Sequence, residues 1–91
     1  MDVARRRVTR AGHEIELTNR EFSLLQYMLE NKTIVLSREQ LLERVWGYEY
    51  LGETNVVDVY VRYLRTKIDE SYPQKLLHTV RGVGYVIRED D

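Results

Sequence analysis

The segment from Asn55 to Glu70 constrains the fold more than any other part of the chain. Thr54 or Asn55 can cap the first turn of a helix here, and Pro73 prevents its continuation. On a wheel of about 100° per residue, one line of this helix is apolar. The side chains on that line are Val57, Val61, Leu64 and Ile68. The sequence therefore predicts a long helix over about residues 55–70 that buries this stripe in a core.

The opposite face of the predicted helix is the first candidate for a binding surface. Val59 and Tyr63 lie side by side on it at i, i+4 spacing, and Arg62 and Thr66 share the face. An arginine fork suits phosphate or the O6 and N7 edge of guanine. A valine can rest on a thymine methyl, and a threonine can donate to a base or a phosphate. A solvated polar face is the simplest alternative, but an exposed aromatic among arginines favours a partner, either DNA or a groove of another protein.

The C-terminal stretch HTVRGVGYVIRE predicts a β-hairpin over about residues 76–88. Two glycines flank Val83, and we expect them to make the bend because glycine supplies the positive φ of tight turns. A phosphate-binding loop needs a helix after its glycines, and the strand-like run that follows here excludes a nucleotide site. Arg81 stands at the tip, either as an ordinary exposed arginine or as a side chain that enters the minor groove of DNA.

Turn and cap signals predict the N-terminal elements. Short extended runs on both sides of Ala11-Gly12 predict a hairpin over about residues 3–17. Thr18 and Glu21 form a capping box, which opens a first helix over about residues 19–31. The apolar side of this helix consists of Phe22, Leu25, Met28 and Leu29.

A second helix is predicted after a short apolar strand. Ser37 and Gln40 form another capping box, and the helix covers about residues 38–46. Gly47 ends it and opens a loop over residues 47–54. The order of hairpin, helix, strand, helix, loop, helix and hairpin is the outline of a winged helix-turn-helix, an α+β fold.

Composition excludes several classes of function. The 91 residues suffice for one small domain, which we expect over residues 1–91. The absence of cysteine excludes disulfide frameworks and cysteine-rich zinc sites, and no apolar run reaches the length of a membrane span. His13 and His78 lie too far apart to suggest a metal site, and no serine stands in a nucleophile motif. We therefore expect a cytoplasmic, non-enzymatic domain with no cofactor, metal or membrane partner.

The distribution of charge indicates more than its sum. The net charge is −1, which by itself does not indicate a nucleic-acid partner. Residues 1–13 are mostly basic, residues 39–53 are mostly acidic, and residues 60–67 hold basic side chains and no acid. A nearly neutral domain can therefore still present one basic face.

Several stretches of the sequence together resemble the effector domain of OmpR/PhoB-type response regulators, the bacterial two-component transcription factors. The stretches are LTNREFSLLQYML, VLSREQLLERVWG, TNVVDVYVRYLRTKID and HTVRGVGYVI, in the family's order and over nearly the whole chain. The resemblance implies a winged helix-turn-helix with an N-terminal antiparallel sheet. It implies that the helix over about residues 55–70 enters the major groove of double-stranded DNA and that the hairpin reaches the minor groove.

The resemblance also implies roles for single residues. The positions that contact bases match Val59, Arg62, Tyr63, Thr66 and Arg81. The positions that contact phosphates match Trp46, Asn55, Tyr60, Arg65, Thr79 and Tyr85. As a residue of the second helix, Trp46 is also expected to be partly buried, with its indole N–H at the edge of the core. The loop from Tyr48 to Thr54 matches the region that can meet RNA polymerase.

The sequence departs from the family in two places. Tyr63 stands where relatives can carry a base-reading arginine, so the family's sequence preference does not transfer. Met1-Asp2 falls inside or just after the first strand of the family's N-terminal sheet, and the receiver domain with its phospho-accepting aspartate is absent. We therefore expect an isolated effector domain that is monomeric by itself and binds repeated half-sites in pairs. The alternative is a winged-helix protein-interaction module anchored by Val59 and Tyr63, which salt dependence would separate from DNA binding.

Overall fold

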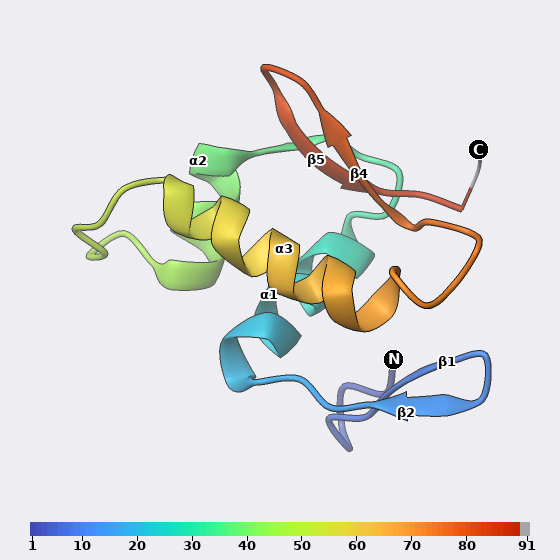
Figure 1. Cartoon of the computed structure of the whole chain (residues 1–91). Helices are drawn as coiled ribbons and strands as arrows, with labels where there is room; N and C mark the ends of the chain where they lie inside the picture. Colours follow the sequence, from blue (N-terminus) through green and yellow to red (C-terminus); the bar gives the residue numbers. More distant parts are fainter. Residues whose placement is uncertain (90–91) are drawn as a thin grey trace.

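The computed structural model describes residues 1–89 and has the predicted α+β architecture (Figure 1). The bounds of its elements are β1 Val8–Arg10, β2 His13–Ile15, α1 Asn19–Glu30, β3 Leu36–Ser37, α2 Arg38–Leu41, η1 Leu42–Trp46, α3 Asn55–Ile68, β4 Leu77–Val80 and β5 Gly84–Ile87. Helix α3 crosses the middle of the molecule, the hairpin of β4 and β5 projects on one side of it, and the hairpin of β1 and β2 lies on the other. No helix within residues 1–89 is long and apolar enough to cross a membrane.

The N-terminal hairpin turns at Ala11-Gly12, as predicted, but its strands cover only Val8–Arg10 and His13–Ile15 of the predicted residues 3–17. Both residues have positive φ, 52° and 81°, which suits the two-residue turns that match the twist of paired strands. β1 and β2 pair antiparallel, with Val8 opposite Ile15. Val8 is buried in the core and Ile15 packs against it, so one face of this small sheet covers the core.

Helix α1 begins with the predicted capping box. The Thr18 hydroxyl accepts a hydrogen bond from the Glu21 amide, and the Glu21 carboxylate accepts one from the Thr18 amide at 2.9 Å. The buried Glu21 also forms an ion pair with Lys67 of α3, at 2.6 Å between Nζ and Oε1. Burial raises the pKa of the Glu21 carboxyl, but the bonds from Lys67 and Thr18 outweigh burial and leave this pKa below its ordinary value. The cap of α1 therefore also anchors α3.

The second helix differs from its prediction. The sequence predicts one α-helix over about residues 38–46, whereas the structure holds the short helix α2 followed by the π-helical segment η1. The wider last turn lets the Gly47 amide bond to the Leu42 carbonyl, five residues back, at 3.1 Å. The Ser37 hydroxyl caps α2 by accepting from the Gln40 amide, but the Gln40 side chain donates to the Tyr27 hydroxyl. The reciprocal half of the predicted capping box is thus replaced by a contact with α1.

Helix α3 buries the predicted stripe and begins at Asn55 as predicted, although its cap and its C-terminal end differ from the prediction. Each of the following side chains is at most 4% exposed: Val57, Val61, Leu64 and Ile68. Thr54 precedes the helix without a side-chain capping bond, because its backbone is already helical at φ −64° and ψ −16°. The helix ends at Ile68 and not near Glu70, because the Asp69 carboxylate accepts from the Leu77 amide at 3.0 Å and draws the chain toward β4.

The C-terminal hairpin is a wing that joins β3 in a three-stranded antiparallel sheet of order β3-β5-β4. Gly82, with a φ of 76°, makes the bend between β4 and β5. Gly84 lies in β5, where an added Cβ would stand 2.8 Å from the Leu36 carbonyl carbon and 2.9 Å from the Ser37 Cα. The prediction that both glycines make the bend is therefore wrong for Gly84. This position requires glycine because β3 passes too close to β5 for a side chain to fit.

Candidate nucleic-acid interface

The face of α3 opposite its buried stripe carries the candidate residues that the sequence places there. The exposed or half-buried side chains on this face are Asn55, Val59, Arg62, Tyr63 and Thr66. The Arg62 guanidinium forms no hydrogen bond or ion pair with any residue in the part of the chain that the structure describes, residues 1–89. A cation without an intramolecular partner can bind a phosphate or a guanine edge without breaking an existing contact.

Thr66 turns its hydroxyl inward, toward its own helix. The hydroxyl donates to the Arg62 carbonyl at 3.1 Å and to the Glu70 carboxylate at 2.9 Å. These acceptors share one proton, since a hydroxyl has a single O–H. The donor that the sequence analysis assigned to a base or phosphate is therefore already used inside the chain, by one acceptor in α3 and one just after its end.

A row of aromatic rings supports Tyr63 from behind. The Tyr63 ring meets the Tyr60 ring edge to face at 5.4 Å, and Tyr60 meets Trp46 in the same way at 5.3 Å. Trp46 is half-buried against the core, as expected, and the Arg20 guanidinium lies 5.3 Å from its ring centroid. Such contacts hold the rings in fixed orientations. Tyr63 remains 46% exposed at the outer end of the row.

Two of the predicted phosphate contacts, Arg65 and Thr79, bond to each other. The Arg65 guanidinium donates to the Thr79 hydroxyl and, at 3.4 Å, to the Leu77 carbonyl, so that α3 is tied to β4. The same guanidinium lies 5.6 Å from the centroid of the Tyr85 ring. All of these partners are uncharged, so Arg65 keeps its full positive charge at the junction of α3 and the wing.

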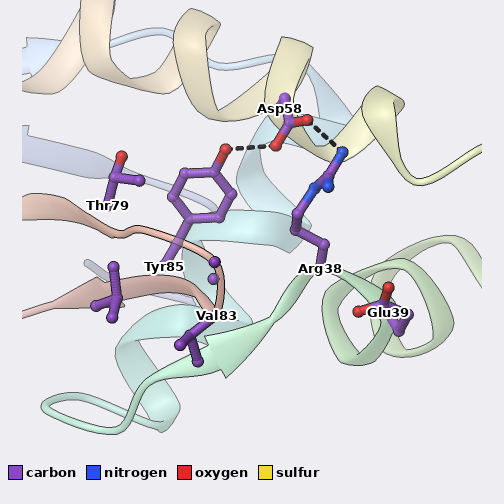
Figure 2. A pocket seen from close by; sticks show the side chains of 9 residues that line it. Arg38, Glu39, Asp58, Thr79, Val83 and Tyr85 are labelled. Carbon is purple, nitrogen blue, oxygen red and sulfur yellow. Dashed lines mark hydrogen bonds and ion pairs between the residues drawn. The ribbon is translucent and has the colours of Figure 1, made fainter.

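Asp58 forms a second tie between α3 and the wing. Figure 2 shows its carboxylate between the Tyr85 hydroxyl, which donates to Oδ1, and the Arg38 guanidinium, which donates to Oδ2 at 2.6 Å. Tyr85 is only 8% exposed. Burial and the bond to Asp58 raise the pKa of Tyr85 to about 12. The Tyr85 hydroxyl, which the resemblance assigns to a phosphate, thus already donates to a carboxylate of the protein itself.

No sequence pattern marks Arg38 and Asp58 as functional residues. Arg38 belongs to α2, directly after its Ser37 cap, and Asp58 stands on the flank of α3 between the core stripe and the outward face. The flank position of Asp58 was visible on the helical wheel. Its partners were not, because they lie 20 and 27 residues away in the sequence.

The wing presents Arg81 at its tip. A turn closed by the Val83 amide and the Val80 carbonyl, at 3.0 Å, exposes this arginine. Its guanidinium has no hydrogen-bond or ion-pair partner among the described residues. A hollow separates the wing from α2 and α3, with Arg38, Asp58 and Thr79 in its wall (Figure 2).

The loop after η1 is the most exposed apolar segment near this surface. Leu51 is 98% exposed, and Tyr48 is also exposed. A hydrogen bond to the neighbouring Glu43 carboxylate raises the pKa of the Tyr48 hydroxyl. Elsewhere, no group of three or more histidine and acidic side chains within residues 1–89 could hold a metal ion.

Comparison with known proteins gives this surface a family context. Residues 12–87 match the family described as "Transcriptional regulatory protein, C terminal". The transcriptional regulatory protein YkoG of Bacillus subtilis is 58% identical over 83 residues, which cover 91% of this chain and 36% of YkoG. The transcriptional regulatory protein PrrA of Mycobacterium tuberculosis is 53% identical over 88 residues, which cover 97% of this chain and 38% of PrrA. The chain thus spans less than two fifths of the length of these relatives.

A solved structure shares both the fold and the arrangement of helix and wing. It is the RstA DNA-binding domain of Klebsiella pneumoniae in complex with the RstA box. The two folds agree with a TM-score of 0.84 at 27% identity, over 98% of this chain and 89% of that chain. The fold is therefore the winged helix-turn-helix that the order of elements predicts. The chain belongs to the family of C-terminal domains of transcriptional regulatory proteins, the effector domains of OmpR/PhoB-type response regulators.

Proposed function

We propose that this chain is the output domain of a two-component response regulator and binds double-stranded DNA in a sequence-specific manner to regulate transcription. One observation carries the proposal. Arg62 on the outward face of α3 and Arg81 at the wing tip have no hydrogen-bond or ion-pair partner within residues 1–89, and they stand on the two projecting elements of a winged helix. A helix of this kind fits the major groove, and an arginine on a thin hairpin fits a narrow minor groove.

Base reading falls to the outward face of α3 and to the wing. We assign it to Val59, Arg62, Tyr63, Thr66 and Arg81. Phosphate contacts fall to residues of η1, α3 and the wing. We assign them to Trp46, Asn55, Tyr60, Arg65 and Thr79. Phosphate contacts of this kind fix the register of the domain on the duplex, and base contacts supply the sequence preference.

Tyr85 receives a different role from the one that the resemblance implies. Its side chain is largely buried and its hydroxyl donates to Asp58, so a direct bond to a phosphate would first have to break that contact. We therefore propose that Tyr85 places the wing relative to α3. Asp58 is the other half of this contact, and Arg38 holds Asp58 from the side of α2.

Other partners follow from the proposed role in a longer regulator. A receiver domain in the same polypeptide would control the output domain, and pairs of domains would occupy repeated half-sites on DNA in the cytoplasm. The exposed loop from Tyr48 to Thr54, with Leu51 at its most exposed point, is a surface for RNA polymerase.

Selection from a pool of random duplexes tests the proposed function. The domain should enrich one motif, and the affinity for that motif should fall steeply between two salt concentrations, because phosphate contacts release counterions. The double variant Arg62→Ala, Arg81→Ala should enrich no motif while keeping its fold, since both side chains are exposed. If no motif is enriched and binding to partner proteins depends weakly on salt, the domain is instead a protein-interaction module anchored by Val59 and Tyr63.

A further inference from the structure

The outward face of α3 is more apolar than its sequence suggests, and this bears on the DNA it prefers. We propose that the helix recognises thymine methyl groups through a methyl face made by Val59, the Tyr63 ring and the Thr66 methyl, with Arg62 contacting a guanine beside them. This inference rests on the proposed DNA-binding function and names the substrate class of that site: half-sites that combine thymines with a guanine.

Thr66 supplies the first observation. Its hydroxyl donates to the Arg62 carbonyl in the preceding turn and to Glu70 in the next. A threonine whose hydroxyl bonds back to the helix has that hydroxyl occupied. The methyl is therefore the group of Thr66 that remains available to a ligand approaching α3. In DNA major grooves, a threonine methyl is a known kind of contact for the thymine methyl.

Tyr63 supplies the second observation. Its ring is 46% exposed and is held edge to face by Tyr60, which is held in turn by Trp46. A ring fixed in this way offers a rigid apolar surface and loses little conformational freedom when a ligand binds. Val59 stands one turn before Tyr63 on the same face and is also rigid, because its side chain branches at Cβ. Both residues can contact a methyl group without reordering.

Arg62 supplies the contrast within this face. It stands four residues before Thr66 and next to Tyr63, and its guanidinium has no partner within residues 1–89. Arginine contacts guanine through the O6 and N7 atoms, which form an edge that no other base presents. The apolar groups on both sides of Arg62 cannot satisfy the donors and acceptors of neighbouring bases. They are instead complementary to the one apolar group in the major groove, the C5 methyl of thymine.

Deoxyuridine tests the inference, because it differs from thymidine only by the missing methyl. In the duplex obtained by selection, each thymidine is replaced in turn by deoxyuridine, and the dissociation constant is measured. At two or three positions that face α3 we expect about fourfold weaker binding, the effect of one methyl-sized group on apolar burial. If deoxyuridine changes nothing at any position of a specifically bound motif, the methyl face is refuted while DNA binding stands.

Two variants of Thr66 separate its methyl from its hydroxyl. Thr66→Ser keeps the hydroxyl and should bind thymidine and deoxyuridine equally at one position. Thr66→Val keeps a methyl and should retain the preference. The opposite result, with preference kept by serine and lost by valine, would show that the hydroxyl reads the base. Arg81→Ala, on the wing, is the matched control and should weaken both duplexes by the same factor. Failure to select any motif would instead overturn the proposed function.

Discussion

Replacing Gly84 by alanine should cost far more stability than replacing Gly82, although both glycines belong to the same short motif. At Gly84 the added Cβ would lie 2.8 Å from the Leu36 carbonyl carbon and 2.9 Å from the Ser37 Cα, with the Leu36 oxygen closer still. These neighbours are backbone atoms, so β3 must move away from β5. We expect about 1–3 kcal/mol from overpacking and about 1 kcal/mol for each pairing hydrogen bond lost. With one or two of these bonds lost, the total is about 2–5 kcal/mol.

Gly82→Ala is the matched control. Gly82 has a φ of 76°, but an added Cβ there would meet nothing within 4 Å. The left-handed conformation costs a non-glycine residue about 1–2 kcal/mol. Part of this cost is offset by about 0.4–1 kcal/mol, because alanine restricts the unfolded chain more than glycine does. The net loss should therefore be about 0–1.6 kcal/mol.

Urea unfolding followed by Trp46 fluorescence measures both free energies of unfolding. Trp46 is the only tryptophan in the chain and is half-buried, so its emission should report unfolding. A small domain is stable by about 5–15 kcal/mol, so Gly82→Ala should retain a folded baseline in the absence of urea. A Gly84→Ala variant without such a baseline has lost at least the full stability of the domain, which also exceeds the loss expected for Gly82→Ala. Equal losses in the two variants, or a loss below about 1 kcal/mol for Gly84→Ala, would refute the idea that the approach of β3 dictates glycine in β5.

Further predictions concern the proposed DNA interface and the ion pair between Glu21 and Lys67. Arg62→Ala should cost about 1–3 kcal/mol on the selected site and relax specificity at one base pair, and equal losses on all sequences in a binding assay would identify a phosphate contact. Arg81→Ala should weaken sites with A/T-rich flanks more than sites with G/C-rich flanks, whereas equal weakening would exclude minor-groove reading. We expect each of the two single variants Tyr85→Phe and Asp58→Asn to lower DNA affinity. The double variant should lose less affinity than the sum of the two single losses, because both substitutions break the same contact. Additive losses would indicate that Tyr85 contacts a phosphate directly. The pKa of Glu21 is lower in the folded than in the unfolded chain, so its charge stabilises the fold above its ordinary pKa, and this effect is lost as the pH falls through the folded pKa. The urea midpoint of Glu21→Gln should therefore depend less on pH in acid than the midpoint of the parent chain.

Features set by neighbours in sequence were predictable here. The Ala11-Gly12 turn and the Thr18–Glu21 capping box involve residues at most three apart, and the structure has both. The buried stripe of α3 was equally visible, because helical spacing alone defines it. The inward bond of the Thr66 hydroxyl is also local, with its acceptors four residues before and after it. It could have been inferred from the known habit of threonine to bond back to the helix.

Features that depend on a second segment were not predictable from local patterns. Gly84 resembles a turn glycine until β3 is placed beside it. Tyr85 resembles a surface donor until Asp58 is placed against its hydroxyl. The π-helical turn of η1 was missed for a different reason, because α and π windings bury nearly the same side chains over one turn. A pattern of apolar residues therefore does not distinguish the two.

The pairing of acids with only some of the cations explains how a chain of net charge −1 can present a basic surface. Arg10 pairs with Asp69, Arg38 with Asp58 and Lys67 with Glu21, all at 2.6–2.7 Å. These pairs neutralise cations that hold elements of the fold together. On α3 and the wing, by contrast, three cations have no carboxylate partner within residues 1–89: they are Arg62, Arg65 and Arg81.

The cations without carboxylate partners lie on the surface proposed to meet DNA, and the structure thereby sets a lower limit on salt dependence. Each phosphate neutralised contributes about −0.9 to the slope of log affinity against log salt. Of these three cations only Arg65 is assigned to a phosphate, so it alone gives a slope of about −0.9 for one domain, and a pair of domains on a repeated site should double it. A variant that loses Lys67, whose charge is already neutralised by Glu21, should leave the slope nearly unchanged, whereas loss of Arg65 should reduce it by about one. The difference between these two neighbours on α3 would show that pairing within the fold, and not the count of basic residues, determines which face of the domain binds DNA.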